Sequence, residues 1–365
     1  MDVSIIVPTY NEGDNVRAIV DCIIQVMVNV SYSYEILFVD DSDDQTILEL
    51  EKLAQSYHFV CFYHRDNMRG LGTAVVEGFK KARGQYLIVM DADLQHPPEL
   101  IPQILEVLNK GTDLVIPSRF IIGGSDGGLN WQRKVVSWTA RTLAGIALKK
   151  ARPVSDCTGG FFGLHRKVVE GLSLNPIGWK ILLEIIVKGS YKSFEEIPYA
   201  FHARQANLSK MNFKEQYNYI KHIVALVTSS PSDRRFFLFC AIGSLGLLVN
   251  MLFFSIMMYL SNQAIFSSVT ASSLAMVHNY IWNDLVTWKD IKNYRHAGRF
   301  SRFVRFCIVC TLGILITALV VKIFTILNWN PYLGQFTGIL VAVTWNFIIN
   351  NVWTWAETIS LKANE

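Results

Sequence analysis

The sequence predicts two structural classes in one chain: an α/β domain with a mainly parallel sheet, followed by an all-α domain of four transmembrane helices. Two observations lead to this prediction. Residues 1–212 alternate short apolar runs with amphipathic helical patterns, whereas residues 236–356 hold four apolar stretches of about membrane-spanning length. The mean hydropathy of +0.27 is high for a soluble protein. A net charge of +4 is too small to indicate nucleic-acid binding, and we expect none.

The elements of the first half follow one another regularly. Strands are expected at 4–7, 35–39, 59–63, 86–90 and 114–117, and helices at 14–28, 44–56, 72–83 and 98–109. Such β-α-β alternation predicts a parallel sheet with crossover helices on its faces. Functional side chains should then gather at the carboxyl ends of the strands.

Polar clusters follow four of the five expected strands. They are Pro8-Thr-Tyr-Asn-Glu12, Asp40-Asp41, Asp91-Ala-Asp93 and Ser118-Arg119. Two carboxylates two residues apart at a strand end suit Mg²⁺ or Mn²⁺, with a substrate diphosphate completing the coordination. A polar turn is the simpler interpretation of one such cluster. Four of them at successive strand ends favour a metal-dependent site.

Several motifs together resemble glycosyltransferase family 2, whose GT-A nucleotide-sugar transferase fold is Rossmann-like. These are Ile5-Ile-Val-Pro-Thr-Tyr-Asn-Glu12, Val39-Asp-Asp41, Arg69-Gly-Leu-Gly-Thr-Ala74 and Asp91-Ala-Asp-Leu-Gln95. Three further segments are similar to the polyprenyl-phosphate (dolichol phosphate) mannosyltransferases. They are Pro117-Ser-Arg119 with Gly123-Gly124, Trp131-Gln-Arg-Lys-Val-Val-Ser137 and Gly178-Trp-Lys-Ile-Leu-Leu-Glu-Ile185. The loop after Asp41 departs from the family pattern, because it lacks the common Pro and Gly.

The resemblance implies a role for each matching residue. Donor binding falls to Pro8, Tyr10, Glu12, Asp40, Asp91, Ala92, Asp93, Arg119, Lys180, Arg204 and Lys210. Asp91, Asp93 and Gln95 would hold the metal, and Arg119, Arg133 and Ser137 would hold the acceptor phosphate. The expected catalytic residues are therefore Asp91, Asp93, Arg119 and Arg133. These residue types suit the chemistry, because a divalent cation and arginines stabilise the charge that builds on a diphosphate leaving group.

The implied reaction transfers mannose, with inversion, from GDP-mannose to dolichyl or another polyprenyl phosphate. The acceptor phosphate is ionised at neutral pH because its second pKa is about 6, so no general base is required. Three alternatives stay open. They are a polyprenyl-phosphate glucosyltransferase using UDP-glucose, a lipid-linked sugar transporter with a nucleotide-sugar-binding domain, and a processive polysaccharide synthase, which the short membrane region disfavours.

Two amphipathic helices are expected beside the membrane. Arg133 and Ser137 are four residues apart and share one face of a helix over 131–148, whose apolar residues we expect to contact lipid. For the helix over 213–228, lying in the membrane interface and ordinary core packing are equally favoured.

The membrane half contains an internal repeat with an offset of 67 residues. Phe239-Cys240, Leu245-Gly246 and Trp288 recur as Phe306-Cys307, Leu312-Gly313 and Trp355. Spans are expected at 236–260, 264–288, 303–327 and 332–356. This half is similar to the GtrA-like membrane domain. Its repeated asparagines, Asn279, Asn283, Asn346 and Asn350, either line a lipid-phosphate path or join helices, and packing is favoured.

Charge and position predict the topology. The loop 289–302 carries five Lys or Arg residues, whereas 261–263 and 328–331 carry none, so both termini and this loop should be cytoplasmic. Met1 leads directly into the first strand, which also favours a cytoplasmic first half. The expected domains are a catalytic domain at 1–212, an interface helix and linker at 213–233, the transmembrane domain at 234–357 and a cytoplasmic tail at 358–365. The six cysteines are expected to be reduced.

Overall fold

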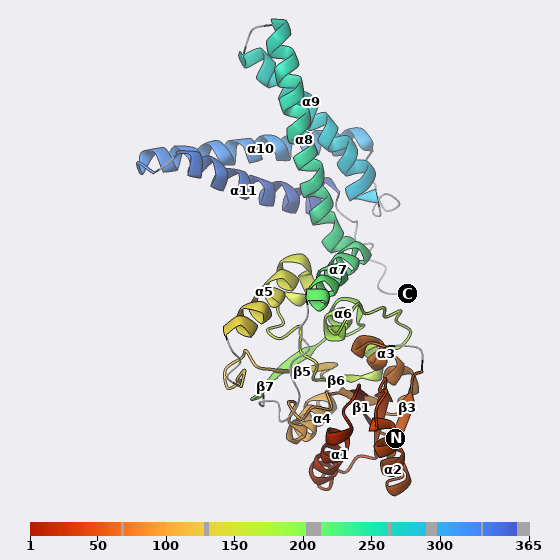
Figure 1. Ribbon diagram of the computed structural model, residues 1–365. Helices are drawn as coiled ribbons and strands as arrows, with labels where there is room; N and C mark the ends of the chain where they lie inside the picture. The colour runs from red at the N-terminus through yellow and green to blue at the C-terminus, as the bar shows by residue number, and fades with distance from the viewer. Residues whose placement is uncertain are drawn as a thin grey trace, which may run out of the picture. The chain divides into compact units, whose positions relative to one another are not determined.

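The computed structural model describes residues 1–66, 69–127, 131–201, 213–261, 264–289, 298–329 and 331–355. It divides into two compact units, which we call unit 1, Met1–Ser229, and unit 2, Ser230–Glu365 (Figure 1). The expected interface helix therefore belongs to unit 1. The expected tail at 358–365 lies outside the described residues.

Unit 1 is built on one seven-stranded sheet in the order β3-β2-β1-β4-β6-β5-β7. Its strands are β1 (Val3–Thr9), β2 (Tyr34–Asp40), β3 (Val60–His64), β4 (Tyr86–Val89), β5 (Leu114–Ser118), β6 (Phe162–His165) and β7 (Phe194–Pro198). Only β6 runs antiparallel to its neighbours, β4 and β5. The mainly parallel α/β fold and five strands are as expected, whereas β6 and β7 were not predicted because neither has a regular apolar run.

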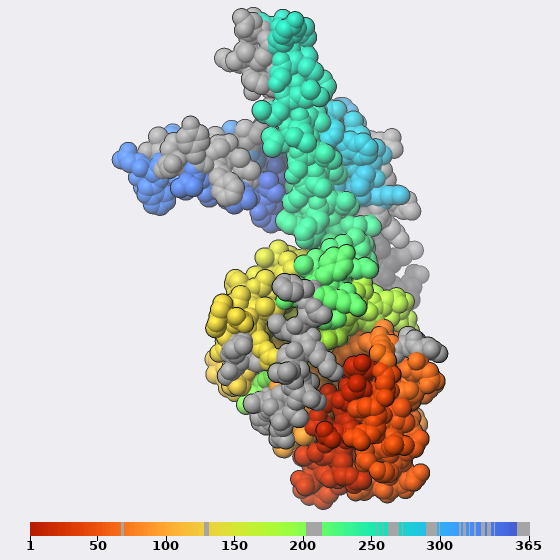
Figure 2. Space-filling model, viewed as in Figure 1, coloured from red at the N-terminus to blue at the C-terminus, as the bar shows by residue number. Residues whose placement is uncertain are grey.

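Helices cover both faces of this sheet (Figure 1). They are α1 (Gly13–Met27), α2 (Thr46–Ser56), α3 (Leu71–Lys81), α4 (Ile101–Asn109), α5 (Trp131–Ala147), α6 (Ile181–Lys188) and α7 (Phe213–Ser229), with single 3-10 turns η1 (Pro98–Leu100), η2 (Lys149–Ala151) and η3 (Arg166–Val168). The helices α5 and α7 adjoin each other, coloured yellow and green in Figure 2, and the Tyr219 hydroxyl donates a hydrogen bond of 2.7 Å to the carbonyl of Ala140.

Alternating side chains of each strand enter two separate cores. Ile5 and Val7 pack with α1, α2 and α4 on one face. Ile6 packs with α3, α5, α6 and α7 on the other face. Because successive strand residues point to opposite faces, near-continuous apolar strands are what a sheet covered on both sides requires.

Unit 2 consists of long apolar helices. They are α8 (Pro231–Ser261), α9 (Ala264–Trp282), α10 (Arg299–Ile326) and α11 (Pro331–Ile349), with one π-helical turn after α9, η4 (Asn283–Thr287), and one after α11, η6 (Asn350–Thr354). Among the described residues, α8 alone is long and apolar enough to cross a membrane by itself. Four spans therefore remain a prediction.

The two repeats of unit 2 meet at a pair of tryptophans. The Trp288 and Trp355 rings stack 4.0 Å apart at an angle of 3°. The indole N–H of Trp288 donates to Oδ1 of Asn351 at 3.2 Å, and that of Trp355 donates to Oδ1 of Asp284 at 3.0 Å. Positions 284 and 351 differ by the repeat offset, so the two repeats exchange equivalent hydrogen bonds.

The repeated asparagines take part in packing. Asn279 and Asn346 lie against Gly246 and Gly313, where an added Cβ would overlap the amide. Asn283 and Asn350 are buried, and each accepts a hydrogen bond from the threonine four residues later. The contacts of Asn279 and Asn346 support the interpretation that these two asparagines join helices, whereas the hydrogen bonds of Asn283 and Asn350 lie within their own helical turns.

Candidate active site

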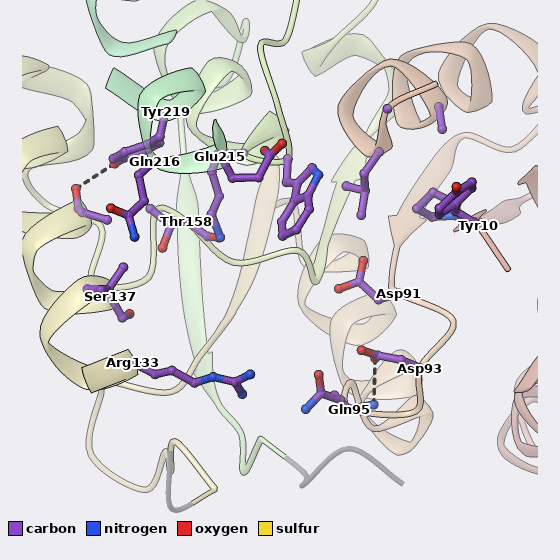
Figure 3. A pocket seen from close by; sticks show the side chains of 18 of the residues that line it. Tyr10, Asp91, Asp93, Gln95, Arg133, Ser137, Thr158, Glu215, Gln216 and Tyr219 are labelled. Carbon is purple, nitrogen blue, oxygen red and sulfur yellow. Dashed lines mark hydrogen bonds between the residues drawn. The ribbon is translucent and has the colours of Figure 1, made fainter. Parts of the chain in front are cut away.

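Unit 1 contains a cavity of about 820 Å³. Its walls come from the carboxyl ends of β1, β2, β4 and β5, the start of α3, the loop before α6, and the helices α5 and α7 (Figure 3). The lining residues are Pro8, Thr9, Tyr10, Glu12, Asp41, Arg69, Gly70, Leu71, Ala74, Asp91, Ala92, Asp93, Gln95, Arg119, Arg133, Val135, Val136, Ser137, Thr139, Ala140, Leu143, Thr158, Trp179, Lys180, Phe201, Glu215, Gln216, Tyr219 and Ile220.

The acidic wall is formed by the turn after β4. Asp91, Asp93 and Gln95 lie together in Figure 3. The backbone N–H of Gln95 donates to Oδ1 of Asp93 at 3.2 Å, and Leu94 between them has a positive φ of 59°. Leucine rarely adopts this conformation, and such strain clusters at functional sites. The turn therefore aims two carboxylates and an amide into the cavity.

This donor set fits a hard divalent cation. Carboxylate and amide oxygens are the ligands that Mg²⁺ and Mn²⁺ prefer. Within the described ranges, no group of three His, Cys, Asp or Glu side chains could hold a metal without other ligands. Two carboxylates and one amide leave coordination positions for substrate oxygens, as a site that binds a metal together with a diphosphate requires.

The turn that carries Asp91 is supported by the buried His96. Its ring is buried and stacks on Phe161 at 5.3 Å between centroids. Burial lowers the pKa of His96 to about 4, and its Nδ1 accepts a hydrogen bond of 3.1 Å from the backbone N–H of Asp91. The imidazole of His96 is therefore neutral at neutral pH. It supports the acidic turn and adds no positive charge that would oppose binding of a cation by Asp91 and Asp93.

Arg119 reaches the cavity from the end of β5. Its Nε and Nη2 donate to the two carboxylate oxygens of the buried Asp156, at 2.8 and 3.0 Å. Burial would lower the pKa of Arg119, but the contact with Asp156 outweighs it and raises that pKa above its ordinary value. The guanidinium is therefore charged and fixed in orientation.

Two further cations face the acidic turn. Arg133 extends from α5 towards Asp93 and Gln95, with Ser137 one helical turn further on (Figure 3). Lys180 donates to the carbonyl of Thr158 at 2.9 Å, and burial together with Arg119 lowers its pKa. Arginine forms paired hydrogen bonds to phosphate oxygens, so this wall suits phosphate groups.

The opposite end of the cavity is shaped by Tyr10 and Arg69. The Arg69 guanidinium lies 5.5 Å from the centre of the Tyr10 ring and forms an ion pair with Asp43. Asp41, which also lines the cavity, accepts two hydrogen bonds from Arg65, at 2.7 and 2.6 Å. An aromatic ring and fixed carboxylates are suited to binding a nucleoside.

The comparisons with known proteins cover both units. Residues 4–172 match the glycosyl transferase family 2 domain, and residues 238–355 match the GtrA/DPMS transmembrane domain. A dolichol-phosphate mannosyltransferase of Pyrococcus furiosus is 37% identical over 98% of this chain and 100% of its own length. The chain belongs to the dolichol-phosphate mannosyltransferase family. It is a glycosyltransferase with a GT-A fold and a membrane domain.

Other similarities are more distant. The dolichol-phosphate mannosyltransferase of Saccharomyces cerevisiae is 34% identical over 67% of this chain and 94% of its own length. A crystal structure of glucosyl-3-phosphoglycerate synthase from Mycobacterium tuberculosis, with Mn²⁺, UDP-glucose and phosphoglyceric acid, has a TM-score of 0.48 at 16% identity. It covers 62% of this chain and 79% of that one.

In this member of the dolichol-phosphate mannosyltransferase family, one cavity brings together most of the residues predicted for the site. Those that line it are Pro8, Tyr10, Glu12, Asp91, Ala92, Asp93, Gln95, Arg119, Arg133, Ser137 and Lys180. Arg204 and Lys210 lie outside the described residues. The roles of these residues remain proposals.

Asp40, which the sequence predicts to bind the donor, is not among the described residues that line the cavity. Its side chain is fully buried, and it accepts hydrogen bonds from Thr9 at 2.8 Å and from Ser42, with Nδ1 of His64 also 2.8 Å away. Its neighbour Asp41 lines the cavity instead. Asp40 therefore joins the ends of β1 and β2 through its hydrogen bond with Thr9.

Sequence reasoning missed the walls contributed by Trp179 and by Glu215, Gln216, Tyr219 and Ile220 of α7. Trp179 lies in the segment 178–185, which resembles the family, and its position next to Lys180 could have indicated that it lines the site. No local motif marks the α7 residues, since they reach the cavity only through the packing of α7 on α5 and α6.

Proposed function

We propose that this glycosyltransferase moves mannose from GDP-mannose to dolichyl or a related polyprenyl phosphate and releases GDP. The observation that carries the proposal is the cavity itself, where Asp91, Asp93 and Gln95 face Arg133 across one space (Figure 3). The names of the relatives support mannose and dolichyl phosphate as substrates. An acidic turn opposite a cationic wall provides for two phosphate-bearing substrates in one site.

On this proposal, Asp91, Asp93 and Gln95 hold Mg²⁺ or Mn²⁺, which would neutralise charge on the departing diphosphate. We assign Tyr10, Glu12 and Asp41 to the nucleoside and Lys180, together with Arg119, to the phosphates of the donor, since all five line the cavity. Lys180 and Arg119 stabilise negative charge most effectively in a water-poor cavity, where electrostatic interactions are strong.

The acceptor phosphate is held by Arg119, Arg133 and Ser137. One of its oxygens attacks the anomeric carbon, the new C–O bond forms as the bond to the diphosphate breaks, and the configuration at that carbon inverts. The nucleophile arrives ionised because the second pKa of a phosphate monoester is about 6. The residues of the chain thus orient and stabilise the two phosphates, and none needs to remove a proton.

The exposed faces of α5 and α7 support access from a membrane surface. Trp131 and Trp138 of α5 are 72% and 61% exposed. Tyr217, Ile220 and Val224 of α7 are also exposed, while Ile223 and Leu226 on the same helix enter the core. Exposed tryptophans on a helix that lines the cavity are suited to a lipid headgroup region. We place this surface and both termini on the cytoplasmic side, in agreement with the basic loop 289–302.

The test is sugar transfer by the full chain in detergent. Labelled GDP-mannose and UDP-glucose would each be offered with dolichyl phosphate, in Mg²⁺, in Mn²⁺ and in EDTA. We expect a mannolipid from GDP-mannose that EDTA abolishes. Formation of glucolipid from UDP-glucose, without mannolipid from GDP-mannose, would show that the donor is UDP-glucose. Absence of both lipid products would overturn the proposal.

Arg133→Ala tests the acceptor site in the same assay. It should raise the KM for dolichyl phosphate about tenfold or more, since a charge-assisted phosphate contact contributes about 1.5–3 kcal/mol. The KM for GDP-mannose should change little. Lys134→Ala, one residue along α5 and paired with Asp126 at 3.0 Å, is the matched control. A larger effect of Arg133→Ala on donor binding would contradict this assignment.

A further inference from the structure

Glu184 is a buried carboxylate in an apolar helix. It lies at the fourth position of α6, where its neighbours Leu182, Leu183, Ile185 and Ile186 are all buried, and its own residue exposure is 1%. Burying an ionised carboxylate is costly unless it is paired and hydrogen-bonded. Burial would raise the pKa of Glu184, but the contacts with His222, Lys188 and Asn175 lower it, so the group is ionised at neutral pH.

The contacts of Glu184 connect different segments of unit 1. Its Oε1 accepts a hydrogen bond of 2.8 Å from the backbone N–H of Asn175, in the loop before α6. The same oxygen accepts one of 2.6 Å from Lys188, on the next turn of α6. Its Oε2 lies 3.4 Å from Nε2 of His222, which is on α7 and equally buried. One side chain therefore joins the loop, α6 and α7.

The loop 175–180 and α7 each form part of the cavity wall. The loop contributes Trp179 and Lys180, and α7 contributes Glu215, Gln216, Tyr219 and Ile220. These two segments also approach each other directly. Gly178 has a φ of 83°, and an added Cβ there would lie 3.0 Å from Oε2 of Glu215.

The two nitrogens of His222 and Oε2 of Glu184 make no well-formed hydrogen bond with any described residue. The 3.4 Å approach of Nε2 of His222 to Oε2 of Glu184 is a buried polar contact between α7 and α6. Tyr219 supplies a second anchor through its hydrogen bond to Ala140 of α5. The face of α7 that includes Tyr219 and His222 is therefore fixed at two points, one on each neighbouring helix.

We propose that Glu184 is a positioning residue that fixes the Trp179–Lys180 wall and the α7 wall of the cavity relative to each other. It acts through Asn175 on one wall and through His222 on the other, and it touches no substrate. The expected effect of Glu184 on transfer kinetics rests on the proposed function, because Lys180 is assigned to the donor and α7 lies beside the acceptor helix α5. Its expected effect on the order of the two walls does not depend on the identity of the substrates.

The first measurement is hydrogen exchange of the full chain in detergent, without substrate. Glu184→Ala should speed exchange in 174–181 and in 213–222, whereas His222→Gln should speed it in 213–222 alone. Lys188→Met is the comparison variant: it removes a partner of Glu184 on α6 together with the hydrogen bond of 3.1 Å from Lys188 to the carbonyl of Ser173, so it should leave exchange in 213–222 unchanged. Unchanged exchange in both segments of Glu184→Ala, or an equal increase throughout unit 1, would overturn the proposal.

The second measurement is transfer kinetics for the same variants. Glu184→Ala should lower kcat/KM for both substrates by about tenfold or more, since displacement of a positioned group by about 1 Å can cost about 100-fold. Glu184→Gln should restore most of this loss, because its amide oxygen can still accept from Asn175. If Glu184→Ala lowered thermal stability but kept both KM values and kcat, Glu184 would have no positioning role. Absence of mannose transfer by the unaltered chain would refute the proposed function while leaving the exchange test valid.

Discussion

Asp156 holds Arg119 at the edge of the cavity by a two-pronged ion pair, with Nε 2.8 Å from Oδ2 and Nη2 3.0 Å from Oδ1. Asp156 is itself fixed, because its backbone N–H donates to Oε1 of Glu196 at 3.2 Å. The neighbouring Ser155 donates to the same oxygen from both its backbone and its hydroxyl. A planar guanidinium held in this way presents its remaining N–H groups in one direction, as bidentate recognition of phosphate requires.

Replacing Asp156 should therefore impair transfer without any direct contact with substrate. In Asp156→Asn, Arg119 loses its counter-charge and its fixed orientation, and we expect kcat/KM to fall by about 10- to 100-fold. Steady-state kinetics with thermal unfolding of the same sample would measure both effects. Asp113→Asn removes a different buried carboxylate of unit 1 and should lower stability while leaving both KM values unchanged. Equal kinetic effects of the two changes would argue against a specific role for Asp156.

Asp93→Ala should abolish transfer, because it removes one of the two carboxylates that can hold the divalent cation beside the diphosphate. Donor binding measured by calorimetry should lose its dependence on Mn²⁺, while the variant inserts into membranes and unfolds like the unaltered chain. Asp21→Ala, on the exposed side of α1, controls for loss of an acidic residue. If the variant kept more than about a tenth of the activity, the loss would be too small for a metal ligand. Asp93 would then not be assigned to the metal site.

The sequence predicted the parts of the fold and site that follow from local patterns. The first five strands and the turn from Asp91 to Gln95 follow from apolar runs that end in polar residues, and such runs specify buried parallel strands. The sequence did not predict β6, because its four residues include Gly163 and pair with distant strands on both sides. Its place in the sheet is set by tertiary packing.

The same distinction holds within the site. Asp91 and Arg119 were found because each directly follows a strand. Asp40 and Asp41 were harder to distinguish, since a strand end gives no indication of which of two adjacent carboxylates turns inward. Tyr219 and Glu215 line the cavity only because α7 packs across α5 and α6, a relationship between segments about 80 residues apart that no local periodicity encodes.

The pKa of Asp113 predicts acid sensitivity in unit 1. Burial would raise this pKa, but hydrogen bonds from Lys167 at 2.6 Å and from the backbone N–H groups of Lys192 and Ser193 lower it to about 2, against an ordinary value of 3.8. Because the folded state lowers the pKa, the stabilisation is complete above the ordinary value and is lost as the pH falls towards 2. Asp113→Asn should therefore lower the thermal unfolding temperature at pH 6, and the difference should shrink steadily below pH 4. A difference that does not vary between pH 6 and pH 3 would contradict this assignment.

The contacts of Asp284 with Arg302 and Trp355 connect the two repeats of unit 2, and they predict a loss of stability that a second substitution should restore. Oδ1 of Asp284 accepts hydrogen bonds from Nε of Arg302 and from Nε1 of Trp355, both at 3.0 Å, and all three side chains are buried. Asp284→Asn should keep the contact with Trp355, because the equivalent position in the second repeat is Asn351, which accepts from Trp288 in the same way. It would remove the negative charge that Asp284 presents to the buried Arg302, and we expect a loss of stability of up to about 3–5 kcal/mol. The double change Asp284→Asn with Arg302→Gln should recover much of that loss, since the buried positive charge is removed together with the negative charge that faced it. Thermal unfolding in detergent of the single and double variants would measure this coupling, and strictly additive effects would show that the ion pair does not hold the repeats together.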